Sequence, residues 1–417
     1  YGWKDKNFDF SDPTKVDCLV CHETTGTYKK FPTMAGNPAT EPTVFPEDKM
    51  EYLPPDWNAV AQSVGRPSRN NCGACHFYGG GGDGVKHGDL DSSLTNPVKS
   101  LDVHMGSKES GGQDFDCARC HTTKLHNIAG RIYSTPAAKE RKSLVQDDLT
   151  SKITCESCHT ASPHKSAKMN DHTDKVACQS CHVPEYARVL PTKMYWDWST
   201  AGKMKDGKPF KTMGPLGKPS YDSKKGDFVW DEKVVPEYYW FNGSITNTTA
   251  KDKIDPSRTV RLSWPVGERS DPNARIMPFK VHRGKTPYDP VNRNMLIPHL
   301  FGKDDAAYWK TYDWNAALKA GMDYVGLPYS GRYEFVETEY VYPITHMVAP
   351  KDKALACEQC HARVGRMAGL AGFYMPARDG SRLLDWLGWG GAVAALVGVA
   401  LHGLGRVVSR RKKEDAQ

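Results

Sequence analysis

The longest run of hydrophobic residues lies near the end of the chain. Residues Trp386–Gly405 contain one polar side chain, His402, over about the 20 residues that a helix needs to cross a bilayer. Trp386 and Trp389 at one end and a basic cluster at the other are typical of the two membrane interfaces, so the positive-inside rule predicts a cytoplasmic C-terminus with the remaining chain outside. The basic cluster consists of Arg406, Arg410, Arg411, Lys412 and Lys413. A buried core helix is the alternative, which this cluster disfavours.

The predicted membrane span has features that indicate a partner in the membrane. Its small residues allow another helix to pack closely against it; they are Gly391, Ala394, Ala395 and Gly398. His402 is interpreted either as a polar residue packed against that partner or as a contact to a quinone or a haem-b subunit. We therefore expect a quinol-oxidising or cytochrome b subunit as partner.

Elsewhere the pattern predicts little long regular structure. Residues Ala137–Leu149 form one of the few helix-like segments. Residues 191–345 carry short aromatic runs such as Tyr195–Trp198 and Tyr238–Phe241 between glycines and prolines, which favours β-hairpins or long ordered loops. This region is interpreted either as a scaffold that covers the core or as a substrate funnel or docking surface.

All 12 cysteines of the chain lie in six Cys-x-x-Cys-His motifs. In such a motif, the two thiols sit on one turn and form thioethers to one porphyrin, and the histidine that follows is placed to bind its iron. The motif residues are Cys18, Cys21 and His22; Cys72, Cys75 and His76; Cys117, Cys120 and His121; Cys155, Cys158 and His159; Cys178, Cys181 and His182; and Cys357, Cys360 and His361.

Zinc sites and disulfides are the alternatives for these cysteines. Pairs of Cys-x-x-Cys units bind zinc, but zinc does not require a histidine directly after every second cysteine. Disulfides leave the histidines equally unexplained. The sequence therefore predicts six covalently bound haems c, and hence an electron-transfer protein or a redox enzyme.

Haem binding shapes the predicted fold. With 37 glycines and 28 prolines in 417 residues, the chain is expected to be rich in loops and to wrap around a stack of apolar haems. We predict a mainly α-helical fold with much irregular structure, plus one C-terminal transmembrane helix. The predicted regions are a five-haem region (1–190), a cysteine-free aromatic-rich region (191–345), a sixth-haem region (346–380) and a membrane anchor with a basic cytoplasmic tail (381–417).

The formal charge of +7 gives no support for nucleic-acid binding. Two propionates on each haem and one positive charge on each oxidised bis-histidine iron would bring the total to about +1 oxidised and about −5 reduced. Because haem is attached to this motif outside the cytoplasm, the chain is expected on the periplasmic side. It opens at Tyr1 without an initiator Met, so we expect a processed or incomplete sequence.

Histidines outside the motifs are candidates for the second axial ligand of each iron. His126 and His164 each follow a motif histidine by five residues, which is too close to reach the opposite face of the same iron. Each is therefore predicted to bind a neighbouring haem. A surface histidine, or one bonded to a propionate, is the alternative at every position. The predicted distal ligands are His87, His104, His126, His164, His172 and His346.

The cysteine-free region holds two further histidines, His282 and His299. The first lies in a basic run with Lys280, Arg283 and Lys285. Cationic groups in such a run bind an oxyanion or a haem propionate. We therefore predict that Lys280, Arg283 and Lys285 stabilise a bound oxyanion and that a nearby histidine, such as His282, delivers protons.

Three segments of the chain resemble the octahaem tetrathionate reductase family. They are Tyr1–Tyr28, Asn71–Leu94 and Pro278–Tyr288, and the resemblance extends over residues 1–365. It implies a periplasmic enzyme that reduces tetrathionate or, in some members, nitrite and hydroxylamine. It also implies a mostly helical, irregular fold in which every haem is bis-histidine except an active-site haem with a lysine ligand and an open face.

The chain departs from that family in two ways. It has six motifs where the family has eight haems, and the two motifs that would be missing precede the segment resembling Tyr1–Lys4. By the family pattern Lys4 is the candidate lysine ligand, with a solvent-exposed lysine as the alternative. The second departure is the C-terminal anchor, which suggests that electrons come from a membrane quinol oxidase subunit.

Three functions remain open on the sequence. The first is a membrane-anchored reductase of tetrathionate or related sulfur and nitrogen oxyanions, fed from the quinone pool. The second is a non-catalytic conduit that passes electrons to periplasmic redox proteins. The third is the reverse reaction, an oxidation of hydroxylamine or thiosulfate. Six bis-histidine haems with no open iron would favour the conduit.

Overall fold

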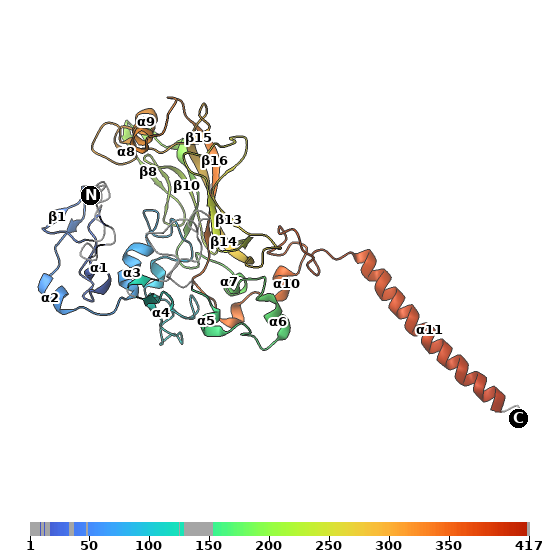
Figure 1. The fold of residues 1–417 in the computed structure, drawn as a ribbon. Helices are drawn as coiled ribbons and strands as arrows, with labels where there is room; N and C mark the ends of the chain where they lie inside the picture. Colours follow the sequence, from blue (N-terminus) through green and yellow to red (C-terminus); the bar gives the residue numbers. More distant parts are fainter. Residues whose placement is uncertain are drawn as a thin grey trace. The chain divides into compact units, whose positions relative to one another are not determined.

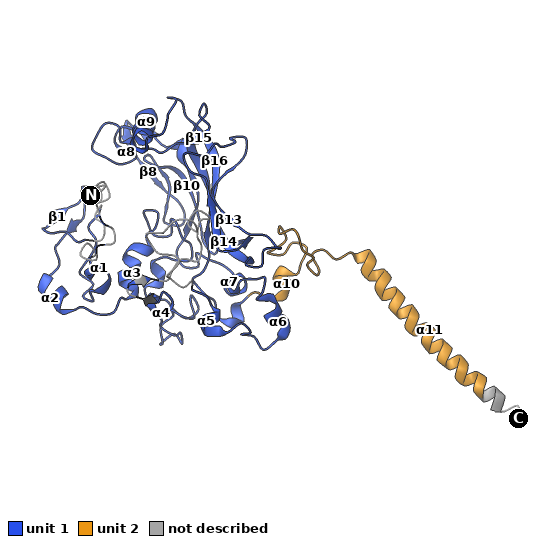
Figure 2. Cartoon of the chain, in the orientation of Figure 1, with its two compact units in different colours: residues 1–354 blue, residues 355–417 orange. Residues whose placement is uncertain are grey.

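The computed structural model describes residues 9, 12, 17–32, 37–46, 49–124, 126–128 and 153–414 (Figure 1). The chain forms two compact units, residues 1–354 and 355–417, coloured separately in Figure 2. The predicted five-haem and cysteine-free regions share the first unit, and the boundary falls within the predicted sixth-haem region. The predicted helix at Ala137–Leu149 and the predicted ligand Lys4 lie outside the described residues.

A ten-stranded mixed sheet is the largest element of the described residues in the first unit. Its main path runs β12–β13–β16–β14–β5–β10–β9–β8, and β11 and β15 also pair with β14. The β13–β16 and β14–β5 pairs are parallel, and the other pairs are antiparallel. The strands are β5 (Thr192–Asp197), β8 (Lys211–Met213), β9 (Pro219–Asp222), β10 (Gly226–Asp231), β11 (Glu237–Phe241), β12 (Ser244–Asn247), β13 (Val260–Val266), β14 (Arg275–Asp289), β15 (Asn294–Met295) and β16 (Glu334–Pro343).

The 15-residue strand β14 is the spine of this sheet. Its Phe279 and Val281 are buried in a core cluster with Phe241 of β11 and Val341 of β16, as expected where aromatic and β-branched side chains meet on one face. Gly284 lets β14 approach β5, because a Cβ there would meet the Trp196 carbonyl oxygen at 2.3 Å.

Two helices lie beside the sheet (Figure 1), and their side chains belong to a second apolar cluster. They are α8 (Tyr308–Thr311) and α9 (Trp314–Val325). Helix α9 begins where the Asp313 side chain accepts a hydrogen bond from the Ala316 N–H, and it ends at Gly326, whose φ of +68° is left-handed. Leu318 and Met322 of α9 are fully buried in the cluster.

The motif-bearing residues fold into short helices and loops rather than long helices. Short two-stranded pairs also occur: β1 (Thr43–Val44) with β2 (Glu51–Tyr52), β3 (Thr123–Lys124) with β4 (Asn127–Ile128), and β6 (Met204–Lys205) with β7 (Lys208–Pro209). The helices here are α1 (Leu19–His22), α2 (Trp57–Gln62), α3 (Arg69–His76), α4 (Cys117–Cys120), α5 (Glu156–His159), α6 (Ala167–His172) and α7 (Cys178–His182).

The prediction of a mainly α-helical fold is wrong. The structure is 26% helix and 21% strand, and its largest element is a mixed sheet. The reason is local: a Cys-x-x-Cys-His motif requires one helical turn and no more, so six motifs add little helix. The aromatic and β-branched residues of 191–345 pair as strands instead.

The second unit contains the sixth motif and the hydrophobic run. Its helices are α10 (Cys357–Cys360) and α11 (Arg382–Glu414). Within α11, residues Arg382–Arg410 are long and apolar enough to cross a membrane, with a mean hydropathy of 1.7 over the most apolar window and none of that window buried.

Candidate functional site

Each described motif forms a single turn that presents two thiols and one imidazole. In four motifs the backbone N–H of the histidine donates a hydrogen bond to the backbone carbonyl of the first cysteine. The distances are 3.0 Å for His22, 2.8 Å for His121, 2.9 Å for His159 and 2.8 Å for His361. All 12 cysteines are described, carry free thiols and are at least partly exposed. This geometry leaves both thiols available to one ligand, with the histidine one turn from the first cysteine.

The first five motif turns lie next to one another in the order in which they occur along the chain. The thiols of Cys72 and Cys117, and those of Cys155 and Cys178, lie close enough to interact directly. The thiol of Cys21 interacts electrostatically with Cys72, and that of Cys120 with Cys158. The second motif is thus adjacent to the first and third, and the fourth to the third and fifth.

Four motif histidines each face a histidine from elsewhere in the described chain. The ring centres are 6.2 Å apart for His22 and His126, 5.9 Å for His159 and His104, 6.4 Å for His121 and His346, and 6.1 Å for His182 and His164. Imidazole nitrogen binds a transition metal at about 2 Å, and the ring centre lies about 1 Å farther away, so a shared metal holds two ring centres about 6 Å apart. The residues present therefore fit an iron in each of these four positions.

The pairing crosses between motifs. His126 faces His22 rather than His121, and His164 faces His182 rather than His159. Each of these two histidines thus lies opposite a different motif from the one five residues before it. The structure brings together four of the six predicted distal histidines with motif histidines, and their function as ligands stays a prediction.

The other two predicted distal histidines have different neighbours. The ring of His87 lies 5.1 Å from Tyr342, and its Nδ1 lies 3.9 Å from the Asp89 carboxylate. His172 places Nδ1 2.7 Å from the Lys168 carbonyl oxygen.

Residues 344–349 carry His346 across the motif region. Backbone N–H groups of Thr345 and His346 donate to Asp89 at 2.8 and 3.0 Å, and that of Val348 donates to Asp102 at 3.1 Å. Both aspartates are buried, at 1% and 2% exposure. They clamp this segment although it lies far from them in sequence.

The sequence analysis missed both aspartates, although the sequence contains a signal for them. Each lies two residues from a predicted distal ligand, in His87–Gly88–Asp89 and Asp102–Val103–His104. The backbone N–H groups of His104 and Met105 donate to Asp102 at 2.8 and 2.9 Å, which fixes the turn that carries His104.

Lys280 and His282 point to one side of β14 and are buried. Lys280 Nζ donates to the carbonyls of Val85 and Lys86, both at 3.1 Å, and to Thr192 Oγ1 at 2.5 Å. Burial lowers the pKa of Lys280 well below its usual range. His282 Nδ1 lies 3.1 Å from the Lys193 carbonyl oxygen, its Nε2 is buried without a hydrogen-bond partner among the described residues, and burial lowers the pKa of this imidazole as well.

Arg283 and Lys285 point to the opposite side of β14. The Arg283 guanidinium donates to both Glu237 oxygens, at 2.8 and 3.1 Å, and Lys285 Nζ lies 3.4 Å from Glu337. The period of two along a strand separates these cations from Lys280 and His282. The four residues predicted to act together on an oxyanion therefore do not converge, and the cations that point outward are paired with carboxylates.

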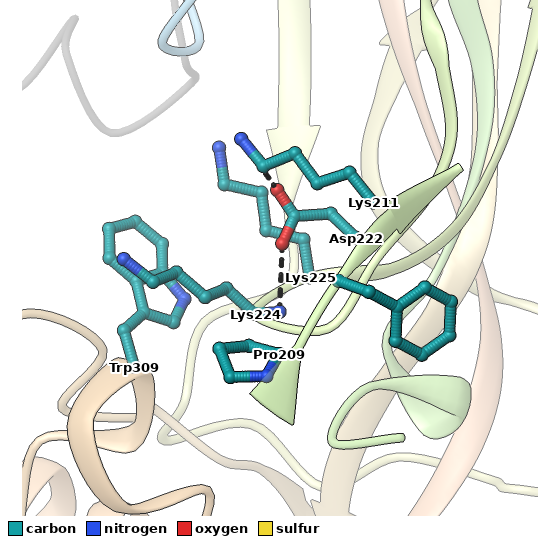
Figure 3. Close-up of a pocket in the computed structure, with 7 residues that line it drawn as sticks. Pro209, Lys211, Asp222, Lys224, Lys225 and Trp309 are labelled. Carbon is teal, nitrogen blue, oxygen red and sulfur yellow. Dashed lines mark hydrogen bonds and ion pairs between the residues drawn. The ribbon is translucent and has the colours of Figure 1, made fainter. Parts of the chain in front are cut away.

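The structure also contains a basic pocket of about 310 Å³ at the edge of the sheet (Figure 3). Lys211 Nζ lies 3.3 Å from Asp222, and Lys225 Nζ lies 5.4 Å from the ring centre of Trp309. The pocket holds no motif residue and no predicted distal histidine. It is lined by Pro209, Phe210, Lys211, Asp222, Lys224, Lys225 and Trp309.

Comparisons with known proteins place this geometry among cytochromes. Residues 193–364 match the family model described as Cytochrome c bacterial. The structure is similar to the crystal structure of an octahaem cytochrome c from Shewanella oneidensis, with 44% identity, a TM-score of 0.73, and coverage of 88% of this chain and 77% of that one. An uncharacterized protein of Archaeoglobus fulgidus is 26% identical over 124 residues, which are 29% of this chain and 40% of that protein.

Proposed function

Because the chain belongs to the multihaem c-type cytochromes, the family of the Shewanella oneidensis octahaem cytochrome c, we propose that it is an extracytoplasmic electron conduit whose irons are closed by histidine on both faces. Haem c supplies reversible one-electron chemistry at iron when it is bound. The conduit would carry six haems, one on each motif.

The facing histidine pairs carry this proposal. His22, His121, His159 and His182 each have an imidazole opposite them at the separation that an iron between them would give. An iron with two protein ligands has no position left for a substrate. The described histidines therefore favour electron transfer over catalysis at these four sites.

The order of the motif turns supports a continuous path. Electrostatic interactions between thiols link the first five motifs in their order along the chain. The sheet holds this row in place. Ser180 of α7 donates to the Ile276 carbonyl of β14 at 2.7 Å, and Lys280 of β14 binds the loop that follows the second motif. These contacts favour the scaffold interpretation of residues 191–345.

The C-terminal helix supports attachment to a membrane. Helix α11 meets the length and hydropathy of a membrane span, and the basic residues after Gly405 would lie on the cytoplasmic side. In this arrangement a quinol-oxidising or cytochrome b subunit donates electrons, and periplasmic redox proteins accept them.

A reductase of tetrathionate or related oxyanions is the second candidate function. The observation that favours it is the 44% identity to an octahaem cytochrome, of which the match spans 77%. That protein carries eight haems, whereas this chain has six motifs. It requires an iron with one open face, for which Lys4 is the predicted ligand. Lys280 and Arg283 would have to leave the hydrogen bonds described above to reach a substrate.

Removing one facing histidine tests the conduit. His164→Ala should convert one low-spin iron to high-spin in the oxidised protein, because the position opposite His182 is emptied while the thioethers to Cys178 and Cys181 keep the haem. His299→Ala is the matched control, since His299 Nε2 contacts Asp304 at 3.0 Å and faces no motif histidine in the described structure. Electron paramagnetic resonance gives the spin state of each variant, and its haem content is measured alongside. An unchanged spin state in His164→Ala would refute this axial pair.

A further inference from the structure

Asp89 is a buried carboxylate directly behind one of the facing histidines. Its Oδ2 accepts the backbone N–H groups of Thr345 and His346 and lies 3.2 Å from Nδ1 of the His346 ring. Its Oδ1 lies 3.9 Å from Nδ1 of His87 and has no hydrogen-bond partner among the described residues. The carboxylate is 1% exposed, so solvent does not screen it.

Three other histidine rings direct Nδ1 to neutral oxygens. His22 Nδ1 lies 2.8 Å from the Gly65 carbonyl, His164 Nδ1 lies 3.3 Å from the Asn170 carboxamide oxygen, and His172 Nδ1 lies 2.7 Å from a backbone carbonyl. Each of these contacts fixes a ring so that Nε2 points away from the acceptor. His104, which faces His159, also has a carboxylate near Nδ1, but that of Asp102 lies 4.0 Å away, beyond hydrogen-bond distance. At His346 the Asp89 carboxylate lies within hydrogen-bond distance of Nδ1, at 3.2 Å.

A carboxylate at Nδ1 changes the ligand as well as holding it. It draws the Nδ1 proton toward itself, which makes Nε2 a stronger donor to a metal, and its own charge further stabilises the oxidised metal in a buried site. Both effects lower the reduction potential of the metal that the ring binds.

The geometry points to Asp89 as the residue that holds the iron between His121 and His346 at a lower reduction potential than its neighbours. This inference rests on the proposed axial pairing of those two histidines. Since His121 belongs to the third of five adjacent motifs, the low-potential position lies in the middle of the row. Asp89 is a positioning residue, because it acts through His346 rather than on iron itself.

Asp89→Asn tests the charge in the intact holoprotein. Asparagine keeps the size and an acceptor oxygen but removes the charge. We expect one iron to become easier to reduce, with its reduced-to-oxidised ratio at a fixed potential rising about tenfold, which is about 59 mV for one electron. Potentiometric titration followed by electron paramagnetic resonance gives this ratio for each low-spin signal.

Asp102→Asn is the matched control. Asp102 is equally buried and clamps the same segment at Val348, but its nearest approach to a ring nitrogen is 4.0 Å, to His104. Any shift in this variant should be smaller and should affect a different signal. Asp89→Glu should restore the low potential, because it restores the charge.

Three outcomes separate the inference from its premise. Unchanged potentials in Asp89→Asn at full haem content would overturn it and leave Asp89 as a backbone clamp. Should that variant fail to fold, the wild-type titration still decides, because the inference requires one low-spin signal to be reduced at a distinctly lower potential than its neighbours. A His346→Ala protein without a new high-spin signal would instead refute the axial pairing itself.

Discussion

The motif region and the sheet region of the first unit are stabilised in different ways. In the sheet, residues 191–345, Phe279, Val281 and Phe241 pack into apolar clusters of the protein's own side chains. In the motif region, residues 17–190, the helices are short, and its two buried clusters include residues from outside the region: Met347 in one, and Ile344 in the other, against which Met194 and Val234 also pack. The sheet therefore has a large apolar core of its own, whereas we expect the motif region to depend more on its cofactors and on residues 344–349.

Producing the protein without haem should give the largest difference in stability between the two regions. In protein produced without haem attachment, we expect amides of the motif helices to exchange with solvent at least about 100-fold faster, while β14 and β16 keep their protection. Hydrogen exchange with mass spectrometry measures both regions in one sample. Equal loss of protection in the sheet would contradict this contrast.

A cavity in the sheet core should have the next largest effect. Phe279→Ala removes a fully buried ring that contacts Phe241 with ring centres 5.3 Å apart, so the free energy of unfolding should fall by about 3–5 kcal/mol. The haem spectrum of the folded protein should not change. Phe301, which is 53% exposed, provides the control, and Phe301→Ala should cost little. Equal destabilisation by Phe279→Ala and Phe301→Ala would contradict the claim that the sheet is stabilised by its own apolar core.

Asp91 in the motif region should make stability depend on pH. Burial raises the pKa of Asp91 to about 6, although Ser93 donates two hydrogen bonds to it. The folded state therefore binds a proton that the unfolded state has lost, and stability falls as pH rises from about 4 to about 6. Asp91→Asn should remove this loss and stabilise the protein by about 3 kcal/mol at pH 8.

Denaturant unfolding at pH 4 and pH 8 measures that gain. The exposed Asp305→Asn serves as the control and should change stability by less than about 0.5 kcal/mol at either pH. A gain for Asp91→Asn that is the same at both pH values would show that the carboxyl does not titrate as described.

Arg283 should give the smallest effect. Its ion pair with Glu237 is about two-fifths exposed, so Arg283→Ala should lower the free energy of unfolding by less than about 1 kcal/mol. If the chain is a conduit, electron flow to an artificial acceptor should be unaffected. A loss of tetrathionate turnover at unchanged haem content would instead favour the reductase.

The sequence predicted the chemistry better than the fold. The motif spacing predicted covalently bound haem c, which the similarity to cytochromes supports, while the individual haem-binding residues stay a prediction. The five-residue offset of His126 and His164 indicated partners in other motifs, and the structure places their rings beside His22 and His182. Hairpins or loops were expected in residues 191–345, but their assembly into one large sheet was missed because its pairing is long-range: β14 joins β5, β11 and β16, and no local pattern encodes those partners.

Two features of the site show where local reasoning ends. The basic run at Lys280–Lys285 reads as one cluster in sequence, but the alternation of a strand divides it between two faces. Asp89 and Asp102 act on residues 345–348, more than 200 positions away. Their roles follow from tertiary contacts, which a single sequence does not show.

Haem stoichiometry, measured together with the spin state of the oxidised, intact protein, tests the conduit most directly. The account predicts one haem for each of the six motifs and low-spin iron throughout. It rests on the four motif histidines that face another histidine, His22, His121, His159 and His182. A high-spin signal from a fully loaded protein would contradict it, and the reductase would then become the leading function.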